Sequence, residues 1–429
     1  MHLWLIPLSY AVISIVCGLG LPRLEDAYFA SYTLNLSVTS VQAFLSAVAS
    51  GMMVLTGIVF SIAFVVVQFS AIAYSPRLVL WFARDPMLFH SLGVFVATFT
   101  YSLATLLWVD RGGSGTVPLF SSSLVAVLLV LSVVLFSRLV QRVNDLQITN
   151  VLRIIGGKGR EVIHEMFQNL DNRTLSEPSS AGSAVDPITQ TLRYSGEPRA
   201  LAMVDVGALV EQATQAVGVI EMACAVGDIL LEDTVILHVR GAKERLLETP
   251  LLKAIHLEAD RTFEQDPKYP IRLLVDIAIK ALSPAINDPT TAVQALDQIE
   301  DLLARLGRRD LDSGYSSDAN GVVRLVFLMP TWEDYLSLAF DEIRQYGKDS
   351  VQIMRRLRAA LLGLAESLTH VDRVDAVRRY LKQLDLDIAR SSLDEEDQAR
   401  ARETDRQGLG MTRKAVRATG PLNIVRPVP

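Results

Sequence analysis

A long uncharged stretch constrains this chain more than any other feature of its sequence. No Asp, Glu, Lys or Arg occurs between residues 27 and 76, and residues 45–69 are almost entirely apolar. A helix needs about 20 consecutive apolar residues to cross the hydrocarbon core of a bilayer, because it rises about 1.5 Å per residue. We therefore predict that residues 45–69 form a transmembrane helix, and that the chain leaves the bilayer near Ser75, Pro76 and Arg77.

Three more apolar segments predict a four-span membrane domain in residues 1–141. The predicted spans cover residues 3–21, 45–69, 88–109 and 119–139. Residues 1–141 hold nine charged side chains and a net charge of +1, whereas the remaining residues carry a net charge of −7. A secretory signal peptide is the alternative for the first segment, but that segment lacks a basic start and a clear cleavage site of small residues.

The distribution of basic residues around the spans predicts their orientation. Cytoplasmic loops of membrane proteins carry an excess of Lys and Arg. Arg77 and Arg84 follow the second span, and Arg138, Arg142 and Arg153 lie at or beyond the end of the fourth, while each of the other two loops has one Arg beside acidic residues. We therefore expect a multi-pass membrane protein, with both termini in the cytoplasm and the lipid bilayer as its first partner.

The soluble two-thirds of the chain divides into three parts by composition. Residues 142–199 are predicted to form juxtamembrane helices and a linker, because residues 171–199 are rich in Ser, Pro and Gly. Residues 200–391 are predicted to form a mainly helical α+β cytoplasmic domain. Residues 392–429 carry dense mixed charge and then several prolines, which predicts a disordered tail. The expected fold is thus an α-helical membrane domain joined to an α+β cytoplasmic domain.

Hydrophobic periodicity predicts the individual helices and strands of the soluble part. The helix that continues from the fourth span is expected to end at Gly156-Gly157. An amphipathic helix near residues 162–170 suits either the lipid headgroups or the surface of the cytoplasmic domain, and both interpretations stay open. Further helices are predicted at residues 206–220, 243–261, 272–282, 289–306, 332–345, 351–368 and 372–388, and strands at 229–240 and 322–329.

The most specific soluble stretch is a predicted helical hairpin at residues 271–292. Ser283 and Pro284 end its first helix, because proline disfavours the helical conformation of the residue before it. Asn287 and Asp288 then begin the second helix, with Asp288 as the N-cap and Pro289 at the first helical position. These residues predict a tight elbow that displays polar groups.

Asp276 and Lys280 lie four residues apart on the first helix of this hairpin. That spacing puts both side chains on one face, so we predict an ion pair. Together with Asn287 and Asp288 they could also be interpreted as a catalytic or cation site. The structural interpretation is favoured, because no His or Cys lies nearby in the sequence and helix capping already explains Asp288.

Two stretches resemble the signatures of a known family. One runs from Ser61 to Arg77 and contains Gln68-Phe69-Ser70 and Ser75-Pro76-Arg77, and the other covers residues 274–292, from Leu274-Val-Asp-Ile-Ala to Asn287-Asp-Pro-Thr-Thr-Ala292. They resemble the bacterial predicted membrane proteins called domain of unknown function 2254. The resemblance implies a bacterial inner membrane protein with a large cytoplasmic domain. It implies no activity, so function has to be argued from the residues.

The second span carries a narrow stripe of small and polar residues at steps of four, seven, four and seven: Ser46, Ser50, Gly57, Ser61 and Gln68. A second stripe, at steps of four along the third span, consists of Gly93, Ala97, Tyr101 and Thr105, and we expect it to complement the first. Small residues let helices pack closely in lipid, and packing is the first interpretation. A water-lined path is the second, because the Gln68 amide loses hydrogen bonds in lipid.

Several classes of function are not favoured. The soluble part is acidic and has no basic, aromatic-rich patch, so nucleic acid is not expected as a partner. Cys17 and Cys224 are far apart in the sequence, and no nucleophile motif, phosphate-binding loop or metal-ligand spacing occurs. We therefore expect neither catalysis nor a bound cofactor or metal.

Two functional hypotheses remain. In the favoured one, copies of the chain form a homo-oligomeric, channel-like assembly for ions or small solutes, and the cytoplasmic domain regulates it. In the other, the spans only anchor a cytoplasmic sensing or scaffold domain. No Asp, Glu, Lys or Arg lies within a predicted span except Arg138 at the end of the fourth. This argues against charge-coupled transport but not against a passive channel.

The orientation can be tested with single cysteines at positions 35 and 172. We expect a membrane-impermeant thiol reagent added from the periplasmic side to label Asn35→Cys and to miss Asn172→Cys, because the first lies in a predicted outer loop and the second in the cytoplasm. Labelling of both cysteines, or of position 172 alone, would contradict the four-span arrangement.

Overall fold

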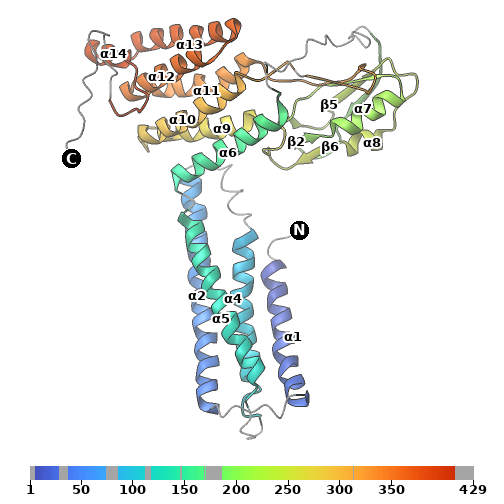
Figure 1. Cartoon of the computed structure of the whole chain (residues 1–429), viewed down its shortest axis with the longest axis vertical. Helices are drawn as coiled ribbons and strands as arrows, with labels where there is room; N and C mark the ends of the chain where they lie inside the picture. The colour runs from blue at the N-terminus through green and yellow to red at the C-terminus, as the bar shows by residue number, and fades with distance from the viewer. Residues whose placement is uncertain are drawn as a thin grey trace, which may run out of the picture. The chain divides into compact units, whose positions relative to one another are not determined.

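The computed structural model describes residues 5–28, 37–73, 86–111, 117–144, 147–168, 170, 186–312 and 314–410. The chain forms two compact units, Met1–Val151 and Leu152–Pro429, and each is described below by itself. Figure 1 labels their helices and strands. Ser75, Pro76 and Arg77 of the first family-like stretch lie outside the described residues.

The described part of the first unit consists mainly of four long helices: α1 (Leu5–Tyr28), α2 (Val38–Ala73), α4 (Pro86–Leu106) and α5 (Leu119–Asn144). Each contains a stretch that is long and apolar enough to cross a membrane. Helix α4 contacts all three of the others. The prediction of four membrane-length helices is confirmed.

Small side chains let α1 pack closely on α4. A Cβ atom added at Gly18 would lie 2.6 Å from the Ala104 Cβ, and one added at Gly93 would lie 2.8 Å from the Tyr10 ring. Both distances are too short for a real side chain, so glycine is required at each position. The small face of α4 therefore packs on α1, at Gly93 and Ala104, and not on the stripe of α2 as expected from the sequence.

Helix α4 also buries four hydroxyl side chains, of which only Thr105 belongs to the predicted stripe: Ser91, Thr98, Ser102 and Thr105. Thr98 Oγ1 lies 2.8 Å from the Val94 carbonyl oxygen and 3.1 Å from Ser132 Oγ of α5. Ser102 Oγ donates to the carbonyl of Thr98. Hydroxyls bonded to their own helix and to a neighbour stabilise helix association in an apolar surrounding.

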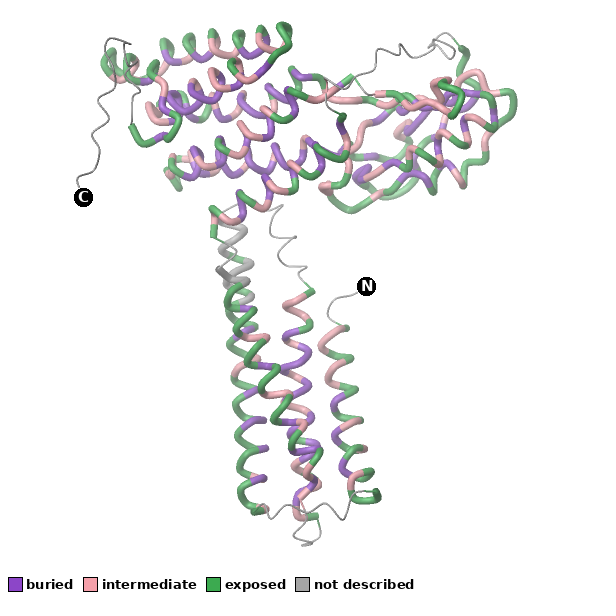
Figure 2. Tube along the Cα trace, in the orientation of Figure 1, coloured by how far each residue is buried: buried purple, intermediate pink, exposed green. Residues whose placement is uncertain are grey.

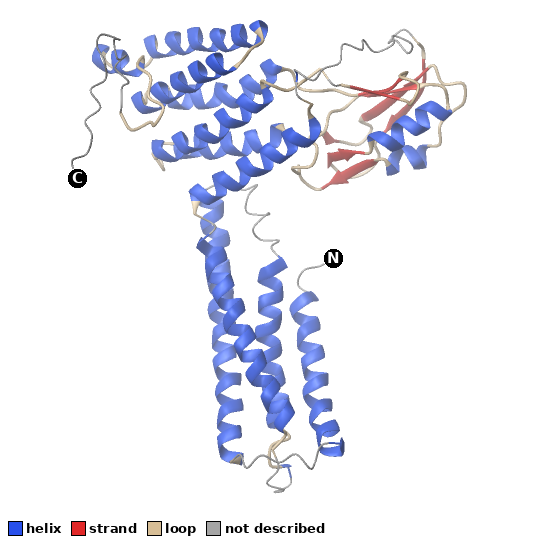
Figure 3. Ribbon diagram, in the orientation of Figure 1, coloured by secondary structure: helices blue, strands red, loops and turns tan. Residues whose placement is uncertain are grey.

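Two small sheets lie on one side of the second unit (Figure 3). The five-stranded sheet has the order β1 (Ile188–Arg193), β5 (Val235–Arg240), β3 (Val219–Met222), β8 (Val323–Val326), β7 (Tyr315–Ser317). Only β3 and β8 pair in parallel among its described strands. The three-stranded sheet has the order β4 (Ile229–Leu230), β2 (Arg199–Val204), β6 (Ile255–Glu258). Helices α7 (Val206–Gln215) and α8 (Glu248–Lys253) complete this part. The two sheets and the two helices share one apolar core.

Several sequence predictions in this part were wrong, because pairing with distant strands overrides local periodicity. Helix α7 starts after its predicted cap Asp205 but ends at Gln215. Val217 then has a left-handed backbone (φ 56°), and Ile220, predicted to be helical, lies in β3. The predicted helix at residues 243–261 is replaced by α8 and β6, and β1 lies within the predicted linker.

The helical part of the second unit follows the predictions closely. Its helices are α9 (Lys268–Ala281), α10 (Pro289–Leu306), α11 (Trp332–Gly347), α12 (Val351–Ser367), α13 (Val371–Ala389) and α14 (Glu395–Ala401). Thr331 and Asp334 form a capping box at the start of α11. Each of α9 to α13 turns an apolar face toward the others, so buried and exposed positions alternate along these helices (Figure 2).

Helix α6 (Ile148–Met166) runs straight through Gly156-Gly157, so the predicted break there was wrong. A Cβ at Gly156 would collide with the Gln298 side chain, and one at Gly159 would lie 2.8 Å from the Leu302 methyl groups. These glycines allow α6 to lie against α10 rather than ending the helix. Val162 and Ile163 are buried, which supports the packed interpretation of the amphipathic segment over the headgroup one.

Part of the segment predicted to be a disordered tail is ordered. Residues 395–401 form α14, and Asp405 is only 1% exposed. The Asp405 carboxylate accepts hydrogen bonds from the backbone N–H groups of Gly408 (3.0 Å) and Gly410 (2.6 Å). A buried carboxylate with such donors holds a segment in place despite its mixed charge. Residues 411–429 lie outside the described residues.

The role of the α6 glycines can be tested by substitution. We expect Gly159→Leu to lower the free energy of unfolding of the second unit by about 1–3 kcal/mol, because the new side chain overlaps Leu302. Gly157→Ala is the matched control: its Cβ meets nothing closer than 3.9 Å, and alanine favours the helix by about 1 kcal/mol. Pulse proteolysis across a urea series measures both. Equal effects of the two variants would contradict the packing role.

Candidate functional site

The elbow of the predicted hairpin is closed by its own hydrogen bonds. Asp288 caps α10 as predicted, since its Oδ1 accepts from Thr291 N (3.1 Å) and its Oδ2 from Thr291 Oγ1 (2.6 Å). Asn287 has a left-handed backbone (φ 48°), which Asn tolerates better than most residues. Ser283 Oγ donates to the Lys280 carbonyl, and Pro284 follows in the exposed turn. The side chains of Ser283 and Asp288 at the elbow thus make hydrogen bonds that stabilise the turn and the start of α10.

Asp276 of the hairpin has a partner that the sequence analysis missed. Arg272, one turn earlier on α9, donates to Asp276 through Nε (2.7 Å). The same guanidinium makes two hydrogen bonds to Glu342 of α11, at 2.6 and 2.9 Å. These bonds lower the pKa of the Glu342 carboxyl, and burial lowers the pKa of the Lys280 ammonium. The arrangement fastens α9 to α11 and leaves Asp276 as a structural acid.

The five stripe residues of α2 all lie on its exposed side: Ser46, Ser50, Gly57, Ser61 and Gln68. The opposite side is the one that packs within the first unit, through Val41, Leu45, Val48, Met52 and Val59. A Cβ atom added at Gly57 would meet nothing within 4 Å. No described residue of the same chain therefore covers the stripe.

Helix α2 is longer than the apolar core of a bilayer is thick. It has 36 residues and is about 54 Å long, whereas the hydrocarbon core is about 30 Å thick. The candidate span among the described residues, Val38–Ile62, contains Ser46, Ser50, Gly57 and Ser61, and Gln68 lies nearer the C-terminal end of the helix.

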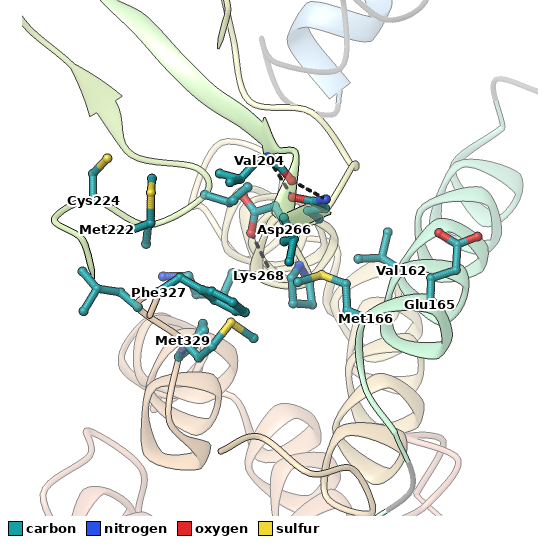
Figure 4. Close-up of a pocket in the computed structure, with 17 residues that line it drawn as sticks. Val162, Glu165, Met166, Val204, Met222, Cys224, Asp266, Lys268, Phe327 and Met329 are labelled. Carbon is teal, nitrogen blue, oxygen red and sulfur yellow. Dashed lines mark hydrogen bonds between the residues drawn. The ribbon is translucent and has the colours of Figure 1, made fainter. Parts of the chain in front are cut away.

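The second unit contains a cavity of about 370 Å³ that the sequence did not reveal (Figure 4). Its lining residues come from α6, from the strands and turns of the sheets, and from the segments that precede α9 and α11: Val162, Glu165, Met166, Val204, Val206, Met222, Cys224, Ala225, Val226, Gln265, Asp266, Pro267, Lys268, Phe327, Leu328, Met329 and Pro330. Most of these side chains are apolar, which is typical of small-molecule sites of this size.

A short polar segment forms one wall of this cavity. Gln265 has a left-handed backbone (φ 50°), and its side-chain amide makes a pair of hydrogen bonds to the backbone of Val204 in β2 (3.0 and 3.1 Å). The next residue, Asp266, is 3% exposed. Its Oδ1 accepts from the N–H groups of Lys268 (3.1 Å) and Tyr269 (3.2 Å) in the first turn of α9.

The second carboxyl oxygen of Asp266 is differently placed. Oδ2 lies 3.5 Å from Arg261 Nε, which itself donates to the Gly227 carbonyl at 2.7 Å. Among the described residues neither Oδ2 nor the buried Tyr335 hydroxyl has a hydrogen-bond partner. Burial raises the pKa of the Asp266 carboxyl, while the positive charges of Arg261 and Lys268 act in the opposite direction.

The cavity offers no activated nucleophile. Cys224 is buried and its thiol lies 3.4 Å from the Ile236 carbonyl oxygen. Burial raises the pKa of this thiol to about 12, so it stays protonated at neutral pH. Nor do three or more His, Cys, Asp or Glu side chains group to hold a metal ion anywhere in the described ranges.

The chain is similar in sequence to a known protein family and to several bacterial proteins. The model of the family described as "Predicted membrane protein (DUF2254)" matches residues 1–362. Uncharacterized proteins of Mycobacterium bovis and Mycobacterium tuberculosis are 25% identical to the chain over 361 residues, which cover 82% of this chain and 69% of each relative. No solved structure matches the chain significantly.

The capping role of Asp288 gives a direct test of the elbow. We expect Asp288→Ala to lower the free energy of unfolding by about 1 kcal/mol, while Asp288→Ser and Asp288→Asn cost little, because both keep an oxygen that can accept from Thr291 N. Urea denaturation measures the difference. A well-folded Asn variant that lost a cellular phenotype of the parent chain would instead assign Asp288 a chemical role.

Proposed function

Because the chain belongs to the family of predicted membrane proteins called domain of unknown function 2254, we propose that it is a multi-pass protein of a bacterial inner membrane. The excess of Arg after the second and fourth predicted spans supports a cytoplasmic location of both termini. The relatives of mycobacteria support a bacterial membrane as its location. The lipid bilayer is accordingly its first partner.

In this proposal copies of the chain associate through the exposed side of α2 and form a channel-like path for ions or small solutes. The observation that carries it is the position of Ser46, Ser50, Gly57 and Ser61, which lie together on the side of α2 that no described residue covers. Small residues on a membrane-length helix favour close contact with another helix. Serine hydroxyls are also suited to line a narrow aqueous path.

A second candidate function is favoured by the cavity of the second unit. An apolar cavity with a buried carboxyl is the usual form of a small-molecule site. In this alternative the spans serve only as an anchor, and the soluble unit senses a ligand without any transport. Neither candidate requires catalysis, a cofactor or a nucleic acid, and we propose none.

The face of α2 can be tested with two leucine variants. We expect Gly57→Leu to weaken association at least tenfold and to lower conductance in planar bilayers, because its bulk prevents close approach of a second helix. Ile58→Leu is the matched control, since Ile58 is also exposed, at 49%, but lies beside the stripe. Sedimentation in detergent measures association. Identical behaviour of the two variants would exclude this face as the interface.

Water in the path can be tested separately. After Cys17 and Cys224 are replaced by alanine, single cysteines at Ser46, Ser50 and Ser61 should react with a water-soluble thiol reagent, and Gln68→Leu should lower conductance while assembly survives. If no cysteine reacts and the bilayers remain silent, the path does not exist and the anchor alternative stands.

A further inference from the structure

The cavity of the second unit has a mainly apolar wall. Figure 4 shows Met166, Met222, Phe327 and Met329 around the space. Met side chains are flexible and polarisable, so they adapt to the shape of an apolar ligand. The volume of about 370 Å³ is at the lower end of the range of ligand pockets, about 300 to 1,000 Å³. The wall therefore offers contact to the apolar surface of a small molecule.

The polar side chains deeper in this wall already have partners within the protein. The Gln265 amide pairs with the backbone of Val204. Asp266 is bonded through Oδ1 to the first turn of α9, and its Oδ2, which has almost no accessible surface, lies against Arg261. The Cys224 thiol lies 3.4 Å from a carbonyl oxygen of β5. None of these groups depends on a ligand to satisfy it.

The other two polar residues of the lining are in contact with solvent. Glu165 is exposed and lies at the edge of the lining side chains in Figure 4, and Lys268 is half-buried. Long charged side chains keep their charged ends in water while their carbon stems cover apolar surface. The charges of these two residues therefore belong to the rim of the cavity, and the side chains of its interior are apolar or already bonded.

Such an interior suits neither water nor a charged ligand. A buried water molecule needs two to four hydrogen-bond partners, and cavities that lack free polar groups stay dry and take up apolar molecules. A charge that enters such a space without a partner loses far more hydration than apolar contact returns. An uncharged apolar molecule meets neither penalty, and its burial removes apolar surface from water on both sides of the contact.

We propose that this cavity binds a small, uncharged and apolar molecule, and that it selects this molecule by size and apolar surface without a directional hydrogen bond. The inference rests on the second candidate function, in which the soluble unit senses a ligand, and it names the class of that ligand. The volume, the methionine-rich wall and the bonded state of the interior polar side chains carry it. The site lies wholly within the second unit and does not depend on α2.

Photolabelling of the full chain in lipid nanodiscs tests the proposal. The probe is 3-trifluoromethyl-3-phenyldiazirine, which is uncharged and apolar, and its adducts are mapped by mass spectrometry of peptides. We expect adducts within residues 222–226 and 327–330, which line the cavity, and we expect naphthalene to suppress them saturably. Adducts on the membrane-length helices are the internal reference, because labelling from lipid does not saturate.

Competitors of matched size define the ligand class when they are compared at equal free concentration in water. We expect naphthalene-1-carboxylate and 1-naphthylmethylammonium each to compete at least about tenfold less well than naphthalene, because either charge would enter the interior unpaired. Indole and indene should compete within about twofold of each other, because the interior side chains hold no free acceptor for the indole N–H.

Val206→Trp places the site, because Val206 lines the cavity and the larger ring fills it. We expect the saturable adducts to fall at least about tenfold in this variant. Val210→Trp is the matched control. Val210 lies one turn further along α7 and packs against the same apolar core, but it is not among the lining residues, so its adducts should equal those of the parent chain.

Four results would overturn the proposal. Better competition by naphthalene-1-carboxylate than by naphthalene would assign an anionic ligand, and a clear preference for indole over indene would show a donated hydrogen bond. Either result would leave the sensing alternative standing. Absence of saturable adducts from the cavity of the parent chain would remove that alternative as well. Equal saturable labelling of the parent and a folded Val206→Trp variant would place the probe elsewhere, and the first three results hold whether or not this variant folds.

Discussion

The carboxyl of Asp266 joins the sheet part and the helical part of the second unit. One oxygen holds the first turn of α9, and the other faces Arg261, which is bonded to the turn at Gly227. Beside it, Gln265 pairs with the backbone of β2. The cavity exists because this segment keeps the two parts in register while the side chains of α6 and of the segment before α11 close the remaining sides. A buried acid is costly, but its bonds here offset that cost locally.

The sequence predicted what depends on local patterns and failed where distant segments meet. The membrane-length helices, α9 to α13 and the cap at Asp288 follow from periodicity and from capping residues close in the chain. Strand β6 was wrongly predicted to be helical. Its partner β2 lies more than fifty residues earlier in the chain, so the local sequence pattern gives no sign of the pairing. Gly156 was predicted to end a helix, but it lies inside α6 and allows that helix to pack closely against Gln298 of α10. The cavity was beyond prediction, since its walls come from segments between residues 162 and 330.

The arrangement of the first unit explains why two stripes that looked complementary in the sequence do not meet there. Helix α4 contacts α1, α2 and α5, and its glycine at position 93 is used by α1. Its Thr98 hydroxyl lies within hydrogen-bond distance of the Ser132 hydroxyl of α5. Helix α2 contributes large apolar side chains and the small Ala49 to this packing. Its small and polar side is not covered by any residue that the structure describes.

The end of the helical part has a consequence for how this family is divided into domains. The match to the family ends at residue 362, inside α12. Helix α13 lies beyond that point, yet its Leu384 and Ile388 are fully buried, as is Ala401 of α14. A chain cut at the edge of the shared sequence would open the apolar side of α12 to water. The segment that matches the family therefore ends before the helices that complete the apolar core around α12.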